Sequence, residues 1–131
     1  MRLTLQTDHA LRILMVLAAA KDEVMSVDAL ARTFGVSKNH LMKTAQALTA
    51  GGFVATVRGR RGGLVLARGA DTITVASVIA HVEPDLHVAE CFFKSGCSFL
   101  PRCRLKGLLA RARSSFMQTL EGETLADLVG A

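Results

Sequence analysis

The spacing of apolar and polar residues predicts a mostly helical chain with one short pair of strands. Apolar side chains recur about every 3.6 residues in several stretches, as expected for helices with one buried face. Residues that can cap a helix precede most of these stretches. The predicted helices are a first one capped by Thr7 and reaching at least Ala18, then Ser26–Phe34, Ser37–Ala50, Val75–Val82, Cys103–Leu120 and Leu125–Val129.

Two of these helices, Ser26–Phe34 and Ser37–Ala50, are separated only by the turn Gly35-Val36. Two short helices joined by a turn that contains glycine are typical of a helix-turn-helix. The second would be the recognition helix, whose first turns meet base edges and phosphates of DNA. The residues predicted to do so are Ser37, Lys38, Asn39, His40 and Lys43. An ordinary helical hairpin with solvated polar residues is the alternative.

The next segment favours the DNA-binding interpretation. Phe53–Arg58 and Leu64–Arg68 are strands by residue type, and the glycine-rich turn 59–63 joins them into a hairpin. The tip carries three arginines, which could enter the negative potential of a minor groove. They are Arg58, Arg60 and Arg61. A helix-turn-helix followed by a basic hairpin is a winged helix, although a solvated hairpin tip remains the alternative.

The long helix predicted near the carboxyl end has one apolar stripe. Its members are Leu105, Leu108, Leu109, Ala112, Phe116 and Leu120. Such a stripe needs a partner surface, and a two-fold dimer would also present two recognition helices to DNA; packing on its own domain is the alternative. We therefore expect a mostly α winged helix-turn-helix (1–83), a loop (84–103), and a dimerisation helix with a short last helix (104–131).

Composition and charge agree with a nucleic-acid partner. Half of the 131 residues are hydrophobic, and no Trp or Tyr is present. Residues 1–70 hold ten Lys/Arg and four Asp/Glu, whereas residues 71–131 hold six and seven. A basic amino-terminal half is the electrostatic footprint of a nucleic-acid binder. The longest apolar run, Ile13–Ala20, is too short to cross a bilayer, so we expect a cytoplasmic protein without a membrane partner.

All three cysteines lie in one segment, as Cys91, Cys97 and Cys103, with five residues between neighbours. An odd number cannot form a closed set of internal disulfides. The spacing is wider than in most zinc sites, and thiolates are the usual ligands of iron–sulfur clusters. Residue type therefore favours a cluster, with zinc and redox-active or buried thiols as alternatives. Candidate fourth ligands are His81, His87, Glu90 and Asp8.

Taken alone, Asp8 is an ordinary carboxylate in the first turn of a helix, able to pair with Arg12 four residues later. A Cys–His pair could serve an enzyme as nucleophile and base, but no further constellation supports catalysis. We therefore expect a binding protein and not an enzyme.

The chain resembles the winged-helix iron–sulfur repressors that include IscR and NsrR, and it is most similar to the nitric-oxide-sensing NsrR group. The stretches that carry the resemblance are Met1–Thr4, Gln6–Arg12, Val57–Leu64, the three cysteines, Pro101–Lys106 and Thr124–Val129. Family members carry their cluster on three cysteines, which implies a 4Fe–4S cluster on those of this chain. The resemblance further implies a homodimer crossed through the long helix, with Asp8 of the partner subunit as fourth ligand and Arg12 beside it in a coupling role.

The implied function is repression by the cluster-loaded dimer, with nitric oxide as the signal that weakens binding to double-stranded operator DNA. IscR-like chains carry His three residues after the last cysteine, whereas this chain has Lys106, which argues against the 2Fe–2S type. His9 is a departure, because NsrR-like chains usually have Tyr there. An IscR-like regulator of iron–sulfur status and a zinc-bound or thiol-based regulator are the alternatives.

Overall fold

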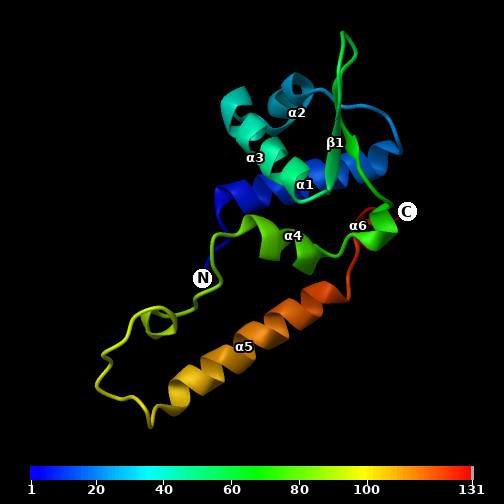
Figure 1. The fold of residues 1–131 in the computed structure, drawn as a ribbon. Helices are drawn as coiled ribbons and strands as arrows, with labels where there is room; N and C mark the ends of the chain where they lie inside the picture. Colours follow the sequence, from blue (N-terminus) through cyan, green and yellow to red (C-terminus); the bar gives the residue numbers. More distant parts are fainter. Residues whose placement is uncertain (131) are drawn as a thin grey trace.

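The computed structural model describes residues 1–130 and has the predicted composition of helices with one hairpin (Figure 1). Its α-helices are α1 (Leu5–Ala20), α2 (Val27–Phe34), α3 (Lys38–Ala50), α4 (Val75–Val82), α5 (Arg104–Glu121) and α6 (Leu125–Val129). Its strands are β1 (Val54–Val57) and β2 (Gly63–Leu66), and two single turns of 3-10 helix are η1 (Ala70–Thr72) and η2 (Glu90–Phe92). The mostly α fold class is confirmed.

The amino end of α1 differs from the prediction. Thr4, not Thr7, is the N-cap, and its hydroxyl accepts a hydrogen bond from the Thr7 backbone N–H. The prediction of Thr7 as the cap was therefore wrong by one turn. Thr7 lies inside the helix and is fully buried, and its hydroxyl donates to the carboxylate of Glu83 at the end of α4.

Helices α2 and α3 form the helix-turn-helix as predicted. Ser26 and Ser37 cap them through hydrogen bonds from the backbone N–H groups of Ala29 and His40. Gly35 stands between the helices with a φ of +65°, a left-handed conformation that glycine adopts without strain. Both helices contribute buried apolar side chains to the cluster that also contains those of α1, which runs through the centre of this body (Figure 1).

The hairpin is antiparallel, with Val54 opposite Leu66 and Val57 opposite Gly63. A third segment pairs with β2 near the turn of the hairpin, because the backbones of Met25 and Leu64 exchange hydrogen bonds of 3.0 and 2.8 Å. A Cβ at Gly63 would lie 2.3 Å from the Met25 carbonyl oxygen, so this close approach requires glycine. The connection between α1 and α2 therefore holds β2 at the end of the strand that is closest to the turn.

The core is closed by α4 and α6. Val78 and Leu125 are fully buried within the same apolar cluster as Ile13 and Leu14 of α1. Helix α6 reaches it because Thr74 and Thr124 form an antiparallel bridge, flanked by the hydrogen bond from Leu125 N–H to the Ile73 carbonyl. The chain after α5 thus returns to the winged-helix body.

Helix α5 lies outside this body, on the far side of α4 from α1 (Figure 1). It is 18 residues long and contains no buried residue. Leu105 and Leu108 of its apolar stripe are 59% and 53% exposed. Across residues 1–130, no helix combines the length and the apolar character needed to cross a membrane.

Candidate functional site

The recognition helix presents most of the predicted DNA-binding side chains to solvent. Asn39, His40 and Lys43 are exposed on the first turns of α3. Ser37 uses its hydroxyl as the N-cap, accepting from His40 N–H at 3.2 Å. Lys38 forms an exposed ion pair with Asp28 of α2, with 3.2 Å between Nζ and Oδ1. Lys38 would have to exchange this carboxylate for a phosphate on DNA, whereas the other side chains need no such exchange.

The first turn of α1 lies beside these residues. Leu5, Gln6 and His9 of α1 line a hollow of about 290 Å³ together with three residues of α3, which are His40, Lys43 and Thr44. His9 is buried at this contact, being 8% exposed. Asp8 lies between Gln6 and His9 in the same turn, so a shift of that turn would act directly on the start of the recognition helix.

The wing places its three arginines at the tip of the hairpin, and all three are exposed. The Gly62 N–H donates to the Gly59 carbonyl at 3.0 Å and closes a tight turn across Arg60 and Arg61. A Cβ at Gly62 would lie 2.3 Å from the Val57 carbonyl oxygen. Among residues 1–130 the ion pairs involve none of these arginines. Their guanidinium groups are therefore available to an external anion.

The three cysteines lie on the long connection between α4 and α5. All are free thiols; Cys91 and Cys103 are half-buried and Cys97 is exposed. Within the part of the chain that the structure describes, no three His, Cys, Asp or Glu side chains are grouped to hold one metal ion. The structure thus gathers the thiols on one loop without bringing them to a common point.

The chemistry of this loop nevertheless suits a thiolate-bound, anionic group. Cys103 is the N-cap of α5 and makes no side-chain capping hydrogen bond. The positive end of the helix dipole therefore meets a sulfur ligand. Arg102 and Arg104 flank that cysteine and are exposed. Between Lys94 and Cys103, the one loop hydrogen bond of the backbone joins Leu100 N–H to the Cys97 carbonyl, so little backbone pairing opposes rearrangement.

Aromatic and cationic side chains pack around the first cysteine. The guanidinium of Arg113 on α5 lies 5.0 Å from the ring centre of Phe92. The His87 ring is tilted against Phe93, with 5.2 Å between ring centres. The Arg113 contact joins the segment next to Cys91 to α5, whereas Phe99 near Cys97 is 75% exposed. The loop is therefore anchored near its start and open near its middle.

The candidate fourth ligands are dispersed. Asp8 pairs with Arg12, with 3.0 Å between Oδ2 and Nε, and its side chain is 45% exposed. Glu90 pairs with Lys94 at 3.3 Å. The Nε2 atom of His81 lies 2.8 Å from the Ala47 carbonyl oxygen of α3, which directs this histidine away from the loop. Figure 1 also shows the loop well apart from α1, the helix that contains Asp8, in the same chain.

Sequence reasoning missed Glu83, which joins α1 to the start of the cysteine loop. Its carboxylate accepts hydrogen bonds from the Thr4 N–H and hydroxyl, at 3.2 Å to Oε2, and from the Thr7 hydroxyl. Pro84 follows at once and ends α4. A glutamate before a proline at a helix end was the available signal, but its partners lie 76 and 79 residues away.

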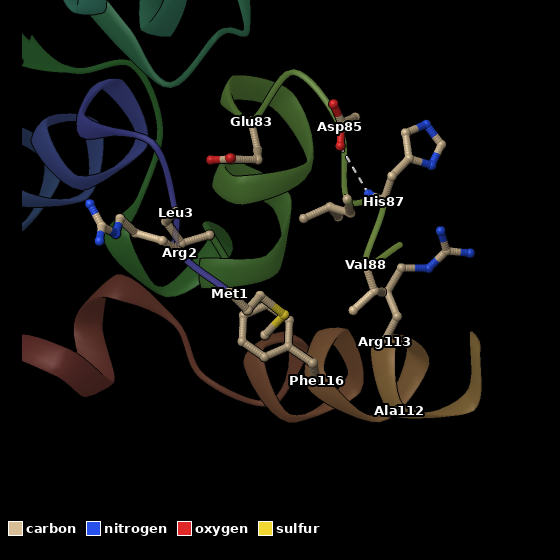
Figure 2. Close-up of a pocket in the computed structure, with 11 residues that line it drawn as sticks. Met1, Arg2, Leu3, Glu83, Asp85, His87, Val88, Ala112, Arg113 and Phe116 are labelled. Carbon is tan, nitrogen blue, oxygen red and sulfur yellow. Dashed lines mark hydrogen bonds between the residues drawn. The ribbon is translucent and has the colours of Figure 1, made fainter. Parts of the chain in front are cut away.

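A pocket of about 570 Å³ opens beside Glu83, between the amino terminus, the start of the loop and α5 (Figure 2). In Figure 2, Met1 and Phe116 overlap near the lower edge of the pocket, and Arg113 and His87 lie to the right of them. Ala112 and Phe116 belong to the apolar stripe of α5. The pocket therefore continues the exposed face of that helix into the body.

A helix-turn-helix with an arginine-tipped hairpin defines this protein as a winged helix-turn-helix of the kind that regulates transcription. Comparison with known proteins identifies its family. Residues 3–131 match the family described as "Rrf2: Iron-dependent Transcriptional regulator", and the chain belongs to this family of regulators. The expectation that it is not an enzyme is confirmed by that membership.

Individual relatives agree over nearly the whole chain. The chain is 39% identical over 132 residues to the HTH-type transcriptional regulator NsrR of Bacillus licheniformis, covering 98% of this chain and 92% of that protein. It is 42% identical over 134 residues to Protein aau3 of Rhizobium meliloti, covering 100% and 86%. The solved structure of CymR, the global cysteine regulator of B. subtilis, superposes with a TM-score of 0.79 at 25% identity, covering 99% and 97%. The resemblance to NsrR-type regulators is thus confirmed.

Proposed function

We propose that this regulator is a homodimeric repressor that senses nitric oxide through an iron–sulfur cluster. The observation that carries the proposal is the set of three free thiols on one loop, at the positive end of α5, in a chain 39% identical to NsrR. Nitric oxide would lower the affinity of the dimer for operator DNA.

Cys91, Cys97 and Cys103 would hold the cluster, most simply of the 4Fe–4S type. Bound there, it would supply iron that reacts with nitric oxide. The remaining ligand would be Asp8 of a second copy, since the loop lies apart from α1 of its own chain. Arg12 already orients the Asp8 carboxylate through a 3.0 Å ion pair, and it would retain this carboxylate when Asp8 is released.

Release of Asp8 would act on DNA binding through the first turn of α1. That turn lines a hollow with His40 and Lys43 of the recognition helix. Movement of the turn would alter how far apart the two recognition helices of a dimer stand, and that spacing must match successive major-groove faces. Asn39, His40 and Lys43 of α3 would contact bases and phosphates, Lys38 and Ser37 the adjoining backbone, and the wing arginines a flanking minor groove.

The dimer would form through α5. Its stripe of apolar side chains is only partly covered in the single chain, and Leu105 and Leu108 are more than half exposed. The pocket beside Glu83 extends the same surface towards the amino terminus. A second copy of α5 crossing this face would bury both stripes at once, as expected for a two-fold interface.

Anaerobic purification tests the cluster directly. Wild-type protein supplied with iron and sulfide should show broad visible absorption and contain both elements, and Cys97→Ser should lose them. Ser95→Ala, two residues away on the same loop, is the matched control and should keep them. Protein that binds zinc alone, or that stays colourless, would contradict the proposal.

Nitric oxide is then titrated into the cluster-loaded protein on DNA. The probe is a duplex enriched by the wild-type protein from a random-sequence pool. Binding should weaken by at least about tenfold, the scale of a coupling free energy of 1–3 kcal/mol. Equal binding before and after the titration would remove nitric oxide as the signal.

The wing is tested by the salt dependence of binding to the same duplex. Arg60→Ala with Arg61→Ala should weaken binding and reduce the slope of log affinity against log salt by about one unit for each phosphate that the wing no longer neutralises. Arg111→Ala removes one positive charge from α5 and should leave the slope unchanged. A slope that stays the same in the wing variant would mean that the hairpin does not touch the DNA backbone.

A further inference from the structure

We propose that His81 is a positioning residue that transmits the state of the cysteine loop to the recognition helix and to the base of the wing. This inference rests on the proposed function. The inference goes beyond the proposed function because it names a route within a single chain, through the last turn of α4.

The first observation is the hydrogen bond between His81 and the end of α3. The Nε2 atom lies 2.8 Å from the Ala47 carbonyl oxygen, and a carbonyl can only accept, so Nε2 carries the proton. The same oxygen accepts from Gly51 N–H at 3.1 Å. His81 thus uses the second acceptor position of a carbonyl in the last turn of α3, where the dipole favours a donor.

The second observation is that the end of α3 is shaped around the imidazole. A Cβ at Gly51 would lie 2.7 Å from both Cδ2 and Nε2 of His81, and 2.7 Å from the ring of Phe53. The backbone conformation at Gly51 is an ordinary right-handed one, so this glycine is required by the closeness of the two rings and not by φ.

The third observation extends the contact to the wing. Phe53, which directly precedes β1, is 3% exposed and lies tilted against His81, with 5.6 Å between ring centres. The guanidinium of Arg68, just beyond β2, lies 5.0 Å from the ring centre of the same phenylalanine. His81 therefore touches the end of α3 and the residue from which the first wing strand starts.

The place of His81 in the chain gives these contacts their consequence. His81 and Glu83 both belong to the end of α4, and the connection to the cysteines begins with Pro84. Glu83 is hydrogen-bonded to the start of α1, and His81 is hydrogen-bonded to the end of α3. Any shift that closure of the loop imposes on this end of α4 therefore reaches the recognition helix through one hydrogen bond.

The test compares His81→Leu, His81→Gln and the control Ala80→Gln, which changes an exposed residue of the same helix. Leucine removes the donor while keeping an apolar side chain, whereas the glutamine amide nitrogen can take the place of Nε2. Binding is measured to the enriched duplex and to the same duplex with its bases shuffled, for cluster-loaded protein before and after nitric oxide. All measurements are made well below the unfolding temperature of each variant.

His81→Leu should bind the enriched duplex about three- to tenfold more weakly, the effect of one hydrogen bond, with unchanged binding to the shuffled duplex. It should also show a smaller change on nitric oxide treatment, and His81→Gln should restore both properties. The proposal would be overturned if His81→Leu kept the wild-type affinity and nitric oxide response. It would also be overturned if affinity fell equally for both duplexes, or if His81→Gln failed to restore the two properties. If the wild-type protein itself ignores nitric oxide, the proposed function fails, and the comparison of the two duplexes alone still decides whether His81 positions α3.

Discussion

The winged-helix body and the segment that leaves it differ in how they are stabilised. Among residues 1–130, every buried side chain lies between Thr7 and Val82 or at Leu125. The 42 positions from Glu83 to Thr124 hold the cysteine loop and α5, and none of them is buried. Helix α4 alone buries five of its eight residues, whereas α5 buries none of 18.

This difference shows which part of the chain needs something from outside. Apolar burial is the main favourable contribution to folding, so the body has its own source of stability. An amphipathic helix whose apolar stripe is only partly covered, and a loop with little backbone pairing, have no comparable source of stability. A second subunit packed against α5 and a group bound by the thiols would supply the stabilising contacts that the helix and the loop lack.

The largest effect on stability should come from Leu125, a residue near the carboxyl end of the chain that packs in the core of the winged-helix body. Leu125→Ala removes a fully buried side chain from the central cluster and should lower the free energy of unfolding by about 2–5 kcal/mol. Leu128→Ala on the same helix, where the leucine is 42% exposed, should cost less than about 1 kcal/mol. Chemical denaturation measures both. Equal effects would mean that α6 is not part of the core.

A smaller effect on folding but a clear one on assembly is expected in α5. Leu108→Asp puts a charge on the exposed stripe of both copies and should weaken the proposed dimer by about 2 kcal/mol or more, roughly thirtyfold. Sedimentation at several concentrations measures the dissociation. Ser114→Asp adds the same charge to an exposed position of α5 outside the stripe and should leave the dimer intact. If neither variant dissociated, the dimer contact would have to lie elsewhere.

The smallest effect concerns the cap that seats α6 on the body. The Thr124 hydroxyl and backbone N–H donate to Asp127 Oδ2 at 2.7 and 2.8 Å. The hydrogen bond from the hydroxyl, followed by the one from the backbone N–H, lowers the pKa of that carboxyl from its ordinary value of 3.8. A depressed folded-state pKa gives stability that is present above pH 3.8 and lost as the pH falls through the folded-state value.

Replacing this carboxylate should therefore flatten part of the acid limb of the stability curve. Asp127→Asn keeps an acceptor but cannot titrate, so its unfolding free energy should fall less steeply than that of the wild type below about pH 4. Thermal unfolding at a series of pH values measures the slope. Asp22→Asn, at an exposed carboxylate between α1 and α2, should follow the wild type. Parallel slopes for Asp127→Asn and the wild type would show that the cap does not contribute.

The elements that were predictable from sequence are those whose signals are local. Ser26, Ser37 and Thr124 are of the residue types that typically cap helices, and each accepts a capping hydrogen bond from the backbone N–H three residues later. The start of α1 was mispredicted because Thr4 and Thr7 are both plausible caps. Their roles are assigned by Glu83, which lies far along the chain and holds Thr7 inside the helix.

The candidate site was predictable in part for the same reason. The exposure of Arg60 and Arg61 follows from a glycine-rich hairpin, and the Asp8–Arg12 pair follows from helical spacing. The contact of His81 with α3 could not be foreseen, since it depends on how two helices pack. Whether three thiols converge on one centre is likewise decided by the fold of the loop and by what binds it, and the sequence gives only their spacing.

Helix α5 is secured to the body at its carboxyl end, where Val75 N–H donates to the Glu123 carbonyl at 2.9 Å and the Thr74 hydroxyl to Glu121 at 3.0 Å. Its 18 residues extend about 27 Å from that attachment to Cys103. A tilt of about 5° at the attached end would carry the far end through about 2 Å, which is comparable to a metal–sulfur bond length. A small adjustment where α5 is attached to the body would therefore be magnified at Cys103.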